Sequence, residues 1–433
     1  MSNTEDIIVI EGNQKLSGTV RVSGAKNSAL KLIAASILSH DICKIDNVPQ
    51  ISDIAIMCKV LISLGAKITT EEKALTIDTT DIDSFEASYF LVSQMRASIA
   101  VLGPLIARFG HAKVAMPGGC QIGARKIDMH LMGLQKMGVN FENDHGYLNA
   151  TTPNGLKGAN ISLEFASVGA TENILMAAVA AEGKTVINNA AREPEIVDLC
   201  NMLNEMGACV SGGGSPIIEI EGKNIEDFHG CNHTTIGDRI EAGTFLVGGA
   251  LTGGPLTVEG INPNYLRTAI MKMRNMGINV ESTDDTITVS RDTSKLLKPI
   301  EIQTLPHPGF PTDLQAQFML LACYAEGTSI ITENVFENRF MFAAEIMRMG
   351  ADITLEEHHA IVNGPSMLQG APVSSTDLRA GASLALAGIM AKGQTLITKV
   401  SHIDRGYEYF TEKLTSLGAD AKRLSMHEFL EIY

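Results

Sequence analysis

A short sequence motif recurs six times along the 433-residue chain: a Leu or Met, a Gly, and a small or branched residue. This repetition restricts the possible folds more than any other feature of the sequence. The glycines are 73, 69, 70, 73 and 68 residues apart, at Gly65, Gly138, Gly207, Gly277, Gly350 and Gly418. Each follows an amphipathic pattern of helical period, and a glycine in that position typically ends a helix. Regular spacing of this length indicates six copies of one structural unit of roughly 70 residues.

Each unit also contains a strand pattern that begins at a second glycine. Examples are the branched runs 183–187 and 327–331, which follow another apolar helical stretch. A unit is therefore predicted to run helix, strand, helix and further strands, so the fold class is α/β. Because three units can close around a shared core and a longer chain tends to split, six units predict two domains of three units each.

Two strand patterns at the start of the chain, 7–10 and 19–22, precede the first full helix. They have no partner in the first three units, so we expect them to pair with the last three. The chain is thus predicted to cross between domains twice. This gives a first domain at 22–235, and a second domain formed by 1–21 and 236–433.

The composition is typical of a globular protein, with 45% hydrophobic and 19% charged residues. The net charge of −15 argues against nucleic acid or an anionic membrane as the main partner, so an anionic substrate would need a local cluster of cations. The chain begins with the acidic segment 1–6 in place of a secretion signal. Glycines interrupt the uncharged stretch 242–258, which we expect to be a buried helix and a strand. These features predict a cytoplasmic protein without a membrane span.

Polar or charged residues stand where the first helix of every unit is predicted to begin: Lys26, Arg96, Ser167, Arg239, Asp313 and Arg379. A helix N-terminus offers free N–H groups and the positive end of its dipole, which suits a phosphate or carboxylate ligand. Taken alone, Ser167 and Asp313 fit helix caps better. Basic residues oppose the dipole, however, so Lys26, Arg96 and Arg379 indicate an anionic ligand.

A second group of residues lies 10 to 13 positions before the helix-ending glycines, at the entrance to the second helix of a unit: Arg125, Glu195, Arg339 and Arg405. Arginine pairs with carboxylate or phosphate in bidentate geometry, so three arginines at related positions fit a shared anion site. For each arginine considered alone, a solvated helix start remains the alternative.

The second unit is longer than the others between its two glycines. Gly110 and Gly138 are 28 residues apart, against 23 to 25 in four other units, and the extra residues fall in the glycine-rich segment 117–123. Such an insertion favours a functional loop. The seven cysteines include no CxxC pair, which indicates free thiols. Only Cys120 lies in such a loop, where Arg125 would make its thiol more reactive, although an accidental loop thiol is the alternative.

In its motifs and in their order along the chain, the sequence resembles the enolpyruvyl transferase family. Within that family it resembles the members that act in peptidoglycan synthesis. The likeness covers nearly the whole chain and rests on segments 23–30, 95–98, 117–125, 167–171, 191–198, 238–241, 306–317, 335–340, 377–380 and 402–408. It implies two inside-out α/β domains, with helices inside and sheets outside, that close on substrate across a cleft. It also implies addition and elimination, in which the enolpyruvyl group of phosphoenolpyruvate passes to the 3′-hydroxyl of UDP-N-acetylglucosamine and phosphate is released. No metal or organic cofactor is implied.

The resemblance further implies roles for individual residues. Those matched to phosphoenolpyruvate are Lys26, Asn27, Arg125 and Arg405. Those matched to the sugar nucleotide are Arg96, Arg125, Lys126, Ile127, Asp128, Met129, Ser167, Val168, Asp313 and Val335. Asp313 would be the base near the 3′-hydroxyl. Cys120 would donate a proton, form a covalent adduct with phosphoenolpyruvate, and be the thiol that fosfomycin alkylates. Lys26 and Arg405 complete the implied catalytic set.

One position departs from the family pattern. Phe165 stands where the members compared often have Lys, so a cationic contact to the UDP diphosphate is in question there, and Lys126 is a candidate replacement. Two alternatives remain open. One is the shikimate-pathway enolpyruvyl transferase, which has a phosphorylated shikimate as acceptor, and the other is a nucleotide-sugar sensor without activity. The oligomeric state is not predicted.

Overall fold

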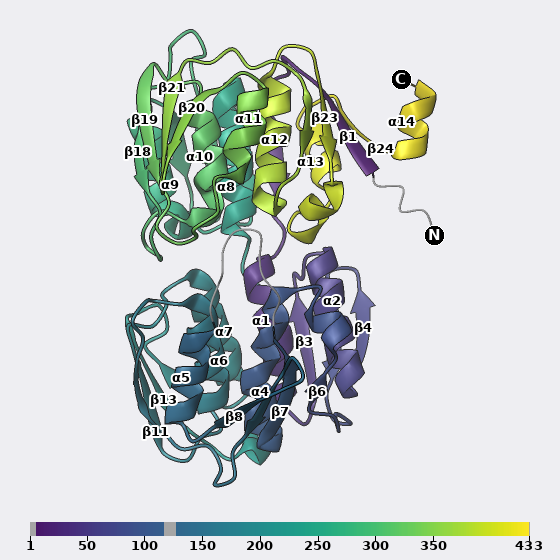
Figure 1. The fold of residues 1–433 in the computed structure, drawn as a ribbon, viewed down its shortest axis with the longest axis vertical. Coiled ribbons are helices and arrows are strands. Elements are labelled where there is room, and N and C mark those ends of the chain that lie inside the picture. Colours follow the sequence, from purple (N-terminus) through teal and green to yellow (C-terminus); the bar gives the residue numbers. More distant parts are fainter. Residues whose placement is uncertain (1–5, 117–126, 433) are drawn as a thin grey trace. The chain divides into compact units, whose positions relative to one another are not determined.

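The structure is a computed structural model that describes residues 6–116 and 127–432 (Figure 1). These residues group into two compact units. Unit 1 contains 6–23 and 237–432, and unit 2 contains 24–116 and 127–236. Each unit has its own core of buried apolar side chains. The predicted fold class, a two-domain α/β protein built from a repeated unit, is confirmed.

Unit 2 contains three repeats, each with a buried first helix, a second helix and a four-stranded sheet. The first helices are α1 (Lys26–Ala35), α4 (Leu102–Phe109) and α6 (Val168–Ala178), and the second are α2 (Ser52–Leu64), α5 (Asp128–Lys136) and α7 (Pro194–Glu205). A short helix, α3 (Tyr89–Val92), precedes α4. The sheets have the strand orders β14-β3-β5-β4, β6-β7-β9-β8 and β10-β11-β13-β12. Their strands are β3 (Ile42–Asp46), β4 (Lys67–Glu71), β5 (Ala74–Asp78), β6 (Glu86–Ala87), β7 (His111–Ala115), β8 (Asn140–Asp144), β9 (Tyr147–Thr151), β10 (Asn160–Ser162), β11 (Lys184–Asn188), β12 (Cys209–Ser211), β13 (Ile217–Glu221) and β14 (Asn232–Thr234).

Unit 1 repeats this plan. Its first helices are α8 (Arg239–Thr252), α10 (Gln315–Ala322) and α12 (Leu378–Met390), and its second helices are α9 (Arg267–Asn275), α11 (Met341–Arg348) and α13 (Phe410–Ser416), with α14 (Met426–Ile432) at the end. The sheet orders are β16-β17-β15-β2, β18-β19-β21-β20 and β22-β23-β1-β24. The strands are β1 (Asp6–Glu11), β2 (Gly18–Arg21), β15 (Leu256–Glu259), β16 (Asn279–Ser282), β17 (Thr286–Ser290), β18 (Glu301–Gln303), β19 (Gly327–Thr332), β20 (Asp352–Glu356), β21 (His359–Gly364), β22 (Pro372–Ser374), β23 (Gln394–Thr398) and β24 (Ala421–Ser425).

The two N-terminal strands complete sheets of the last three repeats. Strand β1 lies antiparallel between β23 and β24, with Ile8 opposite Ile397 and Arg423. Strand β2 runs parallel to β15, with Val20 opposite Val258. The pairing expected for the N-terminal strands is therefore confirmed, and it explains why they have no partner among the first three repeats.

Helices lie inside each unit and sheets outside, as Figure 1 shows. In α8 every side chain from Arg239 to Leu251 is buried, and α10 is buried along its whole length. The strands instead alternate, as in β13, where only Ile218 and Ile220 are buried, so each sheet covers the helices with one face. The uncharged stretch 242–258 forms most of α8 and then β15, as predicted. Within 6–116 and 127–432, no helix is both long and apolar enough to cross a membrane.

The six repeated glycines end helices as their spacing predicted. The second helix of each repeat, in turn α2, α5, α7, α9, α11 and α13, stops one or two residues before its glycine. All six glycines have φ between 95° and 111°. This left-handed conformation costs little for glycine and is unfavourable for residues with a Cβ. Glycine therefore recurs in the sequence because each of these helix ends requires a left-handed residue.

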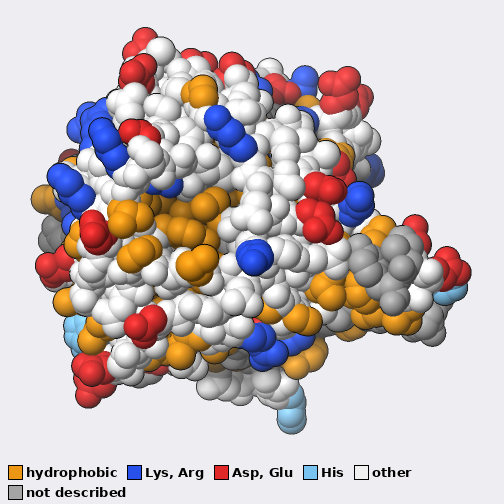
Figure 2. Space-filling model, turned by 90° about the horizontal axis from the view of Figure 1, so that it is seen from above, with side chains coloured by type: hydrophobic (Ala, Val, Ile, Leu, Met, Phe, Trp, Pro, Cys, Tyr) orange, Lys and Arg blue, Asp and Glu red, His pale blue; other side chains and the backbone are white. Residues whose placement is uncertain are grey.

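Charges of both signs are scattered over the face of the molecule in Figure 2, where basic and acidic side chains lie among uncharged ones. This face shows no continuous basic surface of the kind that nucleic-acid-binding proteins use. It agrees with the net negative charge of the chain.

Candidate active site

The residues predicted at helix starts lie there in the structure. Lys26 and Arg239 are the first residues of α1 and α8, and Arg379 is the second residue of α12. Arg96 and Asp313 lie in the 3₁₀ turns Arg96–Val101 and Thr312–Leu314, which lead into α4 and α10. The pattern was therefore right about position, although two of the six repeats begin with a tighter turn.

Ser167 acts as a helix cap, as its residue type predicted when it was considered alone. Its hydroxyl accepts a hydrogen bond from the N–H of Ala170 at 3.3 Å, at the start of α6. Asp313 is not a side-chain cap, because no such hydrogen bond is formed at the turn Thr312–Leu314 or at the start of α10. The side chain of Asp313 thus makes other contacts, which are described below.

Lys26 is a buried cation at the N-terminus of a helix. Only 6% of its surface is exposed, and its Nζ lies 2.7 Å from Oδ2 of Asp53, a 2% exposed residue in the first turn of α2. The dipole of α1 disfavours a positive charge here, and burial adds a desolvation cost. The carboxylate of Asp53 offsets both, so the sequence places a charged pair at a position that an uncharged residue would fill at lower cost.

A second buried ion pair lies one turn along the same helix. Nζ of Lys31 is 2.8 Å from Oε2 of Glu172 in α6, whose side chain is 1% exposed. Burial raises the pKa of Glu172 to about 7, and Lys31 acts in the opposite direction. Two further buried carboxylates, Glu193 and Glu195 at the start of α7, also raise that pKa. Unit 2 therefore holds acidic and basic groups together in its interior, next to α1.

His130 in α5 is a buried neutral imidazole. Burial, assisted by the positive charges of Arg96 and Lys31, lowers its pKa to about 4. Its Nδ1 lies 3.0 Å from Nδ2 of Asn173, and Asn173 also accepts from the N–H of Gly103 at 2.9 Å. The amide of Asn173 donates to the carbonyl of Ile99, so this one side chain links α4, α5 and α6.

The other predicted residues of unit 2 are partly exposed or lie outside the described residues. Partly buried side chains are Asn27, Arg96, Met129, Ser167 and Val168, while Ile127 is buried and Asp128 is exposed at the start of α5. Phe165 is 41% exposed. Cys120, Arg125 and Lys126 fall between 117 and 126, outside the described residues.

In unit 1, Asp313 is held by two arginines from different elements. Nη2 of Arg339 lies 2.6 Å from Oδ1, and Nη2 of Arg379 lies 3.6 Å from Oδ2. Both arginines are almost fully buried, whereas the carboxylate of Asp313 is 24% exposed. The acid thus faces solvent at one edge while the guanidinium groups fix its orientation from within.

Arg379 has hydrogen-bonding capacity that is not used within the described part of the chain. Its Nε and Nη1 are buried and have no hydrogen-bond partner there. The guanidinium lies over the ring of Tyr407, 5.2 Å from the centroid, and a Cβ on Gly406 would be 3.7 Å from Nη1. Buried cationic donors without acceptors are costly, so this arrangement is suited to an anionic ligand.

A network of neutral and acidic groups supports Arg339. The hydroxyl of Thr312 accepts from Nη1 of Arg339 at 3.0 Å and donates to Glu333 at 2.8 Å. The other carboxylate oxygen of Glu333 accepts from the N–H groups of Val335 and Phe336. Val335, one of the predicted sugar-nucleotide residues, is therefore tied through Glu333 to the same cluster as Asp313.

Arg405 ends the turn Val400–Arg405, next to Gly406 and Tyr407. Its side chain is partly buried. The adjoining Tyr407 is 3% exposed, and its hydroxyl lies 2.9 Å from that of Thr244 in α8. Burial raises the pKa of Tyr407, and Arg379 opposes that effect. Unit 1 thus gathers Asp313, Arg339, Arg379 and the turn that carries Arg405.

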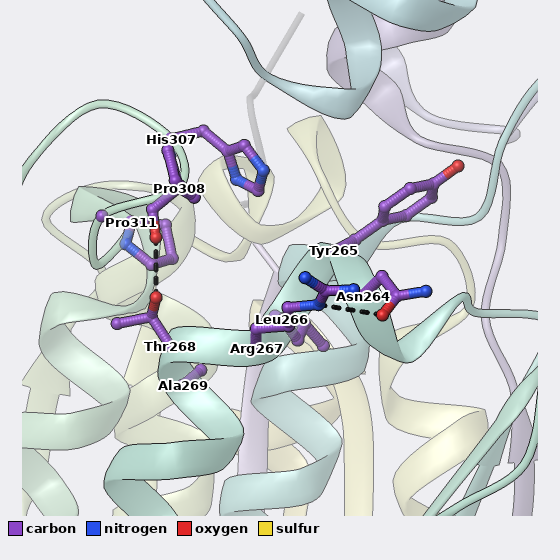
Figure 3. Close-up of a pocket in the computed structure, with 10 residues that line it drawn as sticks. Asn264, Tyr265, Leu266, Arg267, Thr268, Ala269, His307, Pro308 and Pro311 are labelled. Atoms are coloured by element: carbon purple, nitrogen blue, oxygen red, sulfur yellow. Dashed lines mark hydrogen bonds between the residues drawn. The ribbon is translucent and has the colours of Figure 1, made fainter. Parts of the chain in front are cut away.

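The loop before Asp313 forms one wall of a small hollow, shown in Figure 3. The hydroxyl of Thr268, in α9, donates to the carbonyl of Pro308 at 2.6 Å, and Nε of Arg267 donates to Asn264 at 2.9 Å. The side chains of His307 and Tyr265 extend from opposite walls. The bond from Thr268 anchors the segment that leads directly into the turn Thr312–Leu314 and so supports the position of Asp313.

Several residues of these clusters were not singled out from the sequence. Asp53, Glu172, His130, Asn173 and Glu333 lie at positions that the repeat does not mark, and their partners come from other repeats or elements. The sequence marks Arg339 and Arg379 by their charge and their positions in the repeat, but it does not indicate their shared partner. The pairing of both with Asp313 across 26 and 66 positions has no sequence signal in a single chain.

The fold of paired three-repeat units is the fold of the enolpyruvyl transferases. The family model described as EPSP synthase (3-phosphoshikimate 1-carboxyvinyltransferase) matches residues 10–414, and the chain belongs to this family.

Among its relatives, "UDP-N-acetylglucosamine 1-carboxyvinyltransferase 2" of Staphylococcus saprophyticus is 51% identical over 421 residues, which cover 96% of this chain and 99% of the relative. The UDP-N-acetylglucosamine 1-carboxyvinyltransferase of Pseudoalteromonas atlantica is 48% identical over 420 residues, 97% and 100% of the two chains.

Solved structures show the same fold. The enolpyruvyl transferase NikO from Streptomyces tendae matches with a TM-score of 0.89 at 27% identity, over 97% of this chain and 99% of that chain. An EPSP synthase from Acinetobacter baumannii matches with a TM-score of 0.73 at 20% identity, over 97% of this chain and all of the other. The second likeness concerns the fold alone.

Proposed function

We propose that this chain transfers the enolpyruvyl group of phosphoenolpyruvate to the 3′-hydroxyl of UDP-N-acetylglucosamine, releasing phosphate, in peptidoglycan synthesis. The observation that carries the proposal is the Asp313 cluster, in which a partly exposed carboxylate lies between two buried arginines, one with unused donors. A substrate with both a phosphate and a carboxylate suits such a site. The relatives at about half identity over nearly their full length support this acceptor.

The chemistry requires a proton at one carbon of the enol and attack by a hydroxyl at the next. We assign the proton to the thiol of Cys120 and the base to Asp313. The tetrahedral intermediate then loses phosphate, which cations stabilise as it leaves, and a proton from the carbon that was protonated, which restores the double bond. We assign that role to Lys26, Arg125 and Arg405, and we place Asn27 with them against phosphoenolpyruvate.

Asp313 can act as a base only if an oxygen lone pair is available to the hydroxyl. Oδ1 of Asp313 lies beside Arg339 and Oδ2 beside Arg379, and each carboxylate oxygen can accept more than one hydrogen bond. The partial exposure of the carboxylate leaves an approach for the substrate, while Arg339 and Arg379 stabilise its charged form. We infer that the two arginines position the base as well as binding anion.

We assign the sugar nucleotide to Arg96, Arg125, Lys126, Ile127, Asp128, Met129, Ser167, Val168, Asp313 and Val335. Exposed Phe165 offers a ring face in place of a cation, so we assign the diphosphate contact to Lys126. We also propose that the two units correspond to the domains 22–235 and 1–21 with 236–433, and that the enzyme works in the cytoplasm.

Two alternatives predict different behaviour. A transferase that acts on shikimate 3-phosphate would share the fold, but an EPSP synthase is only 20% identical. A nucleotide-sugar sensor would bind ligand without turnover, and would have no reason to keep a buried Lys26–Asp53 pair together with the Asp313 cluster.

The test is phosphate release from phosphoenolpyruvate with each acceptor in turn. We expect release that depends on UDP-N-acetylglucosamine and none with shikimate 3-phosphate. Release with shikimate 3-phosphate alone would reverse the assignment, and binding without release from either acceptor would favour the sensor. Asp313→Asn, which keeps the shape of the side chain, should abolish release while circular dichroism shows an intact fold.

A further inference from the structure

Two cysteines of unit 2 lie opposite each other on neighbouring strands. Strands β3 and β14 pair in parallel, with Asn232 opposite Lys44 and His233 opposite Ile45. One residue further back, this register places Cys231 opposite Cys43. The N–H of Lys44 donates to the carbonyl of Cys231 at 2.8 Å, so the pairing extends to that residue.

This placement satisfies the main requirement for a disulfide. Neighbouring strands are about 4.7–4.9 Å apart, and disulfides join Cα atoms that are about 4.4–6.8 Å apart. Side chains opposite each other in a parallel pair point to the same face of the sheet. The backbone therefore already holds Cys43 and Cys231 within bonding range, although both are free thiols in the structure.

The two cysteines differ in exposure and in the pKa of their thiols. Cys231 is partly exposed, whereas Cys43 is fully buried. The neighbouring Cys231 lowers the pKa of Cys43, and burial opposes that effect. Loss of one proton from the pair thus gives a thiolate whose neighbour is still a thiol.

The three cysteines on or next to core helices behave differently. Burial raises the pKa of Cys58 to about 11, and that of Cys200 and Cys323 to about 12. Their thiols stay protonated at neutral pH and are correspondingly unreactive. Among the cysteines that the structure describes, Cys43 and Cys231 are the two that lie opposite each other on neighbouring strands.

We propose that Cys43 and Cys231 form a reversible redox site that is oxidised to a disulfide by hydrogen peroxide. A thiolate sulfur attacks one oxygen of the peroxide, the O–O bond breaks, and water leaves after taking up a proton. The sulfenic acid that results is attacked by the second sulfur, its S–O bond breaks, and a second water leaves. Two thiols and one peroxide thus give one disulfide and two waters, and a dithiol reductant reverses the reaction.

The disulfide changes the stability of unit 2. It joins β3, near the start of the unit, to the residue that precedes its last strand β14, and so closes a loop that contains most of the unit. Cross-links that close long loops restrict the unfolded chain most strongly. Oxidation should therefore raise the melting temperature by about 5 °C or more.

The experiment exposes the full-length protein to hydrogen peroxide, blocks remaining thiols, and maps peptides without reduction. We expect a cross-linked peptide that contains Cys43 and Cys231, its loss on treatment with dithiothreitol, and a raised melting temperature that returns to its starting value. Cys231→Ser, at the partly exposed position, should remove both effects. Cys43→Ser should do the same, but Cys231→Ser decides the matter if the buried change impairs folding.

Cys209→Ser is the matched control, since Cys209 is exposed on β12 and lies in the same unit. This variant should still form the cross-link and show the same thermal shift. The proposal is overturned if peroxide converts Cys231 to a sulfinic acid without a cross-link, if the disulfide forms between other cysteines, or if Cys231→Ser leaves the thermal shift unchanged. None of these readouts depends on transferase activity, so failure of the proposed function would not affect them.

Discussion

Replacing Asp53 by Asn removes the negative charge that lies 2.7 Å from the ammonium of Lys26, and keeps the shape of the side chain. Two charges at this distance attract each other by about 6 kcal/mol at an effective dielectric constant of 20. Desolvation offsets part of that energy, and breaking one side of a buried pair typically costs about 3–5 kcal/mol. For a unit of this size, a loss of about 3 kcal/mol lowers the melting temperature by roughly 6 to 12 °C.

The informative part of this test is what phosphoenolpyruvate does to the variant. If Lys26 binds the substrate anion, saturating phosphoenolpyruvate should supply the missing charge and raise the melting temperature of Asp53→Asn far more than that of the wild type. Circular dichroism is the suitable probe, because the chain contains no tryptophan. Asp81→Asn is the control, since its pair with Lys67 has a similar distance of 2.6 Å but is exposed, and we expect no change. Equal stabilisation of wild type and Asp53→Asn by the ligand would refute an anion-binding role for Lys26.

Three further predictions follow from the other clusters. Burial lowers the pKa of His130 to about 4, so the unfolded state binds more protons than the folded state between pH 6.5 and 4. The free energy of unfolding should therefore fall by about 3 kcal/mol as the pH drops through that range. His130→Gln should flatten this pH dependence, measured by urea denaturation at each pH. Arg379→Lys keeps the charge but loses the Nε and Nη1 donors, so KM for phosphoenolpyruvate should rise by about 10- to 100-fold; Arg348→Lys, at an exposed position, should not change it, and an unaltered KM in Arg379→Lys would exclude this arginine from the anion site. Fosfomycin should alkylate Cys120, and a mass-spectrometric adduct on another cysteine would remove that thiol from the mechanism.

Much of the fold could be predicted because it repeats. A glycine at Gly207 or Gly350 is required by a left-handed backbone at a helix end, and the requirement returns in each repeat, so its period is visible in the sequence. The same applies to the helix starts, where Lys26 and Arg379 lie as expected. The conformations at helix ends and helix starts depend on a few neighbouring residues, so the residue types that favour them can be recognised in the sequence.

The pairings that build the candidate site are of another kind. Asp53 is in the second helix of a repeat and meets Lys26 in the first, while Asp313 meets Arg379 from a different repeat. The packing of whole helices decides which side chains contact each other. In a single sequence, a carboxylate that forms such a contact cannot be distinguished from an acidic residue on the solvent-exposed face of a helix. The buried state of His130 was hidden for the same reason, because its partner Asn173 lies in another helix.

Transfer of the enolpyruvyl group to the 3′-hydroxyl is tested most directly by identifying the product. The enzyme is incubated with phosphoenolpyruvate and UDP-N-acetylglucosamine, and the nucleotide fraction is analysed by mass spectrometry and NMR. We expect a sugar nucleotide that has gained one enolpyruvyl group as an ether at the 3′-oxygen, formed in equal amount to released phosphate. Unmodified UDP-N-acetylglucosamine, or an enolpyruvyl group found only on a different acceptor, would contradict it.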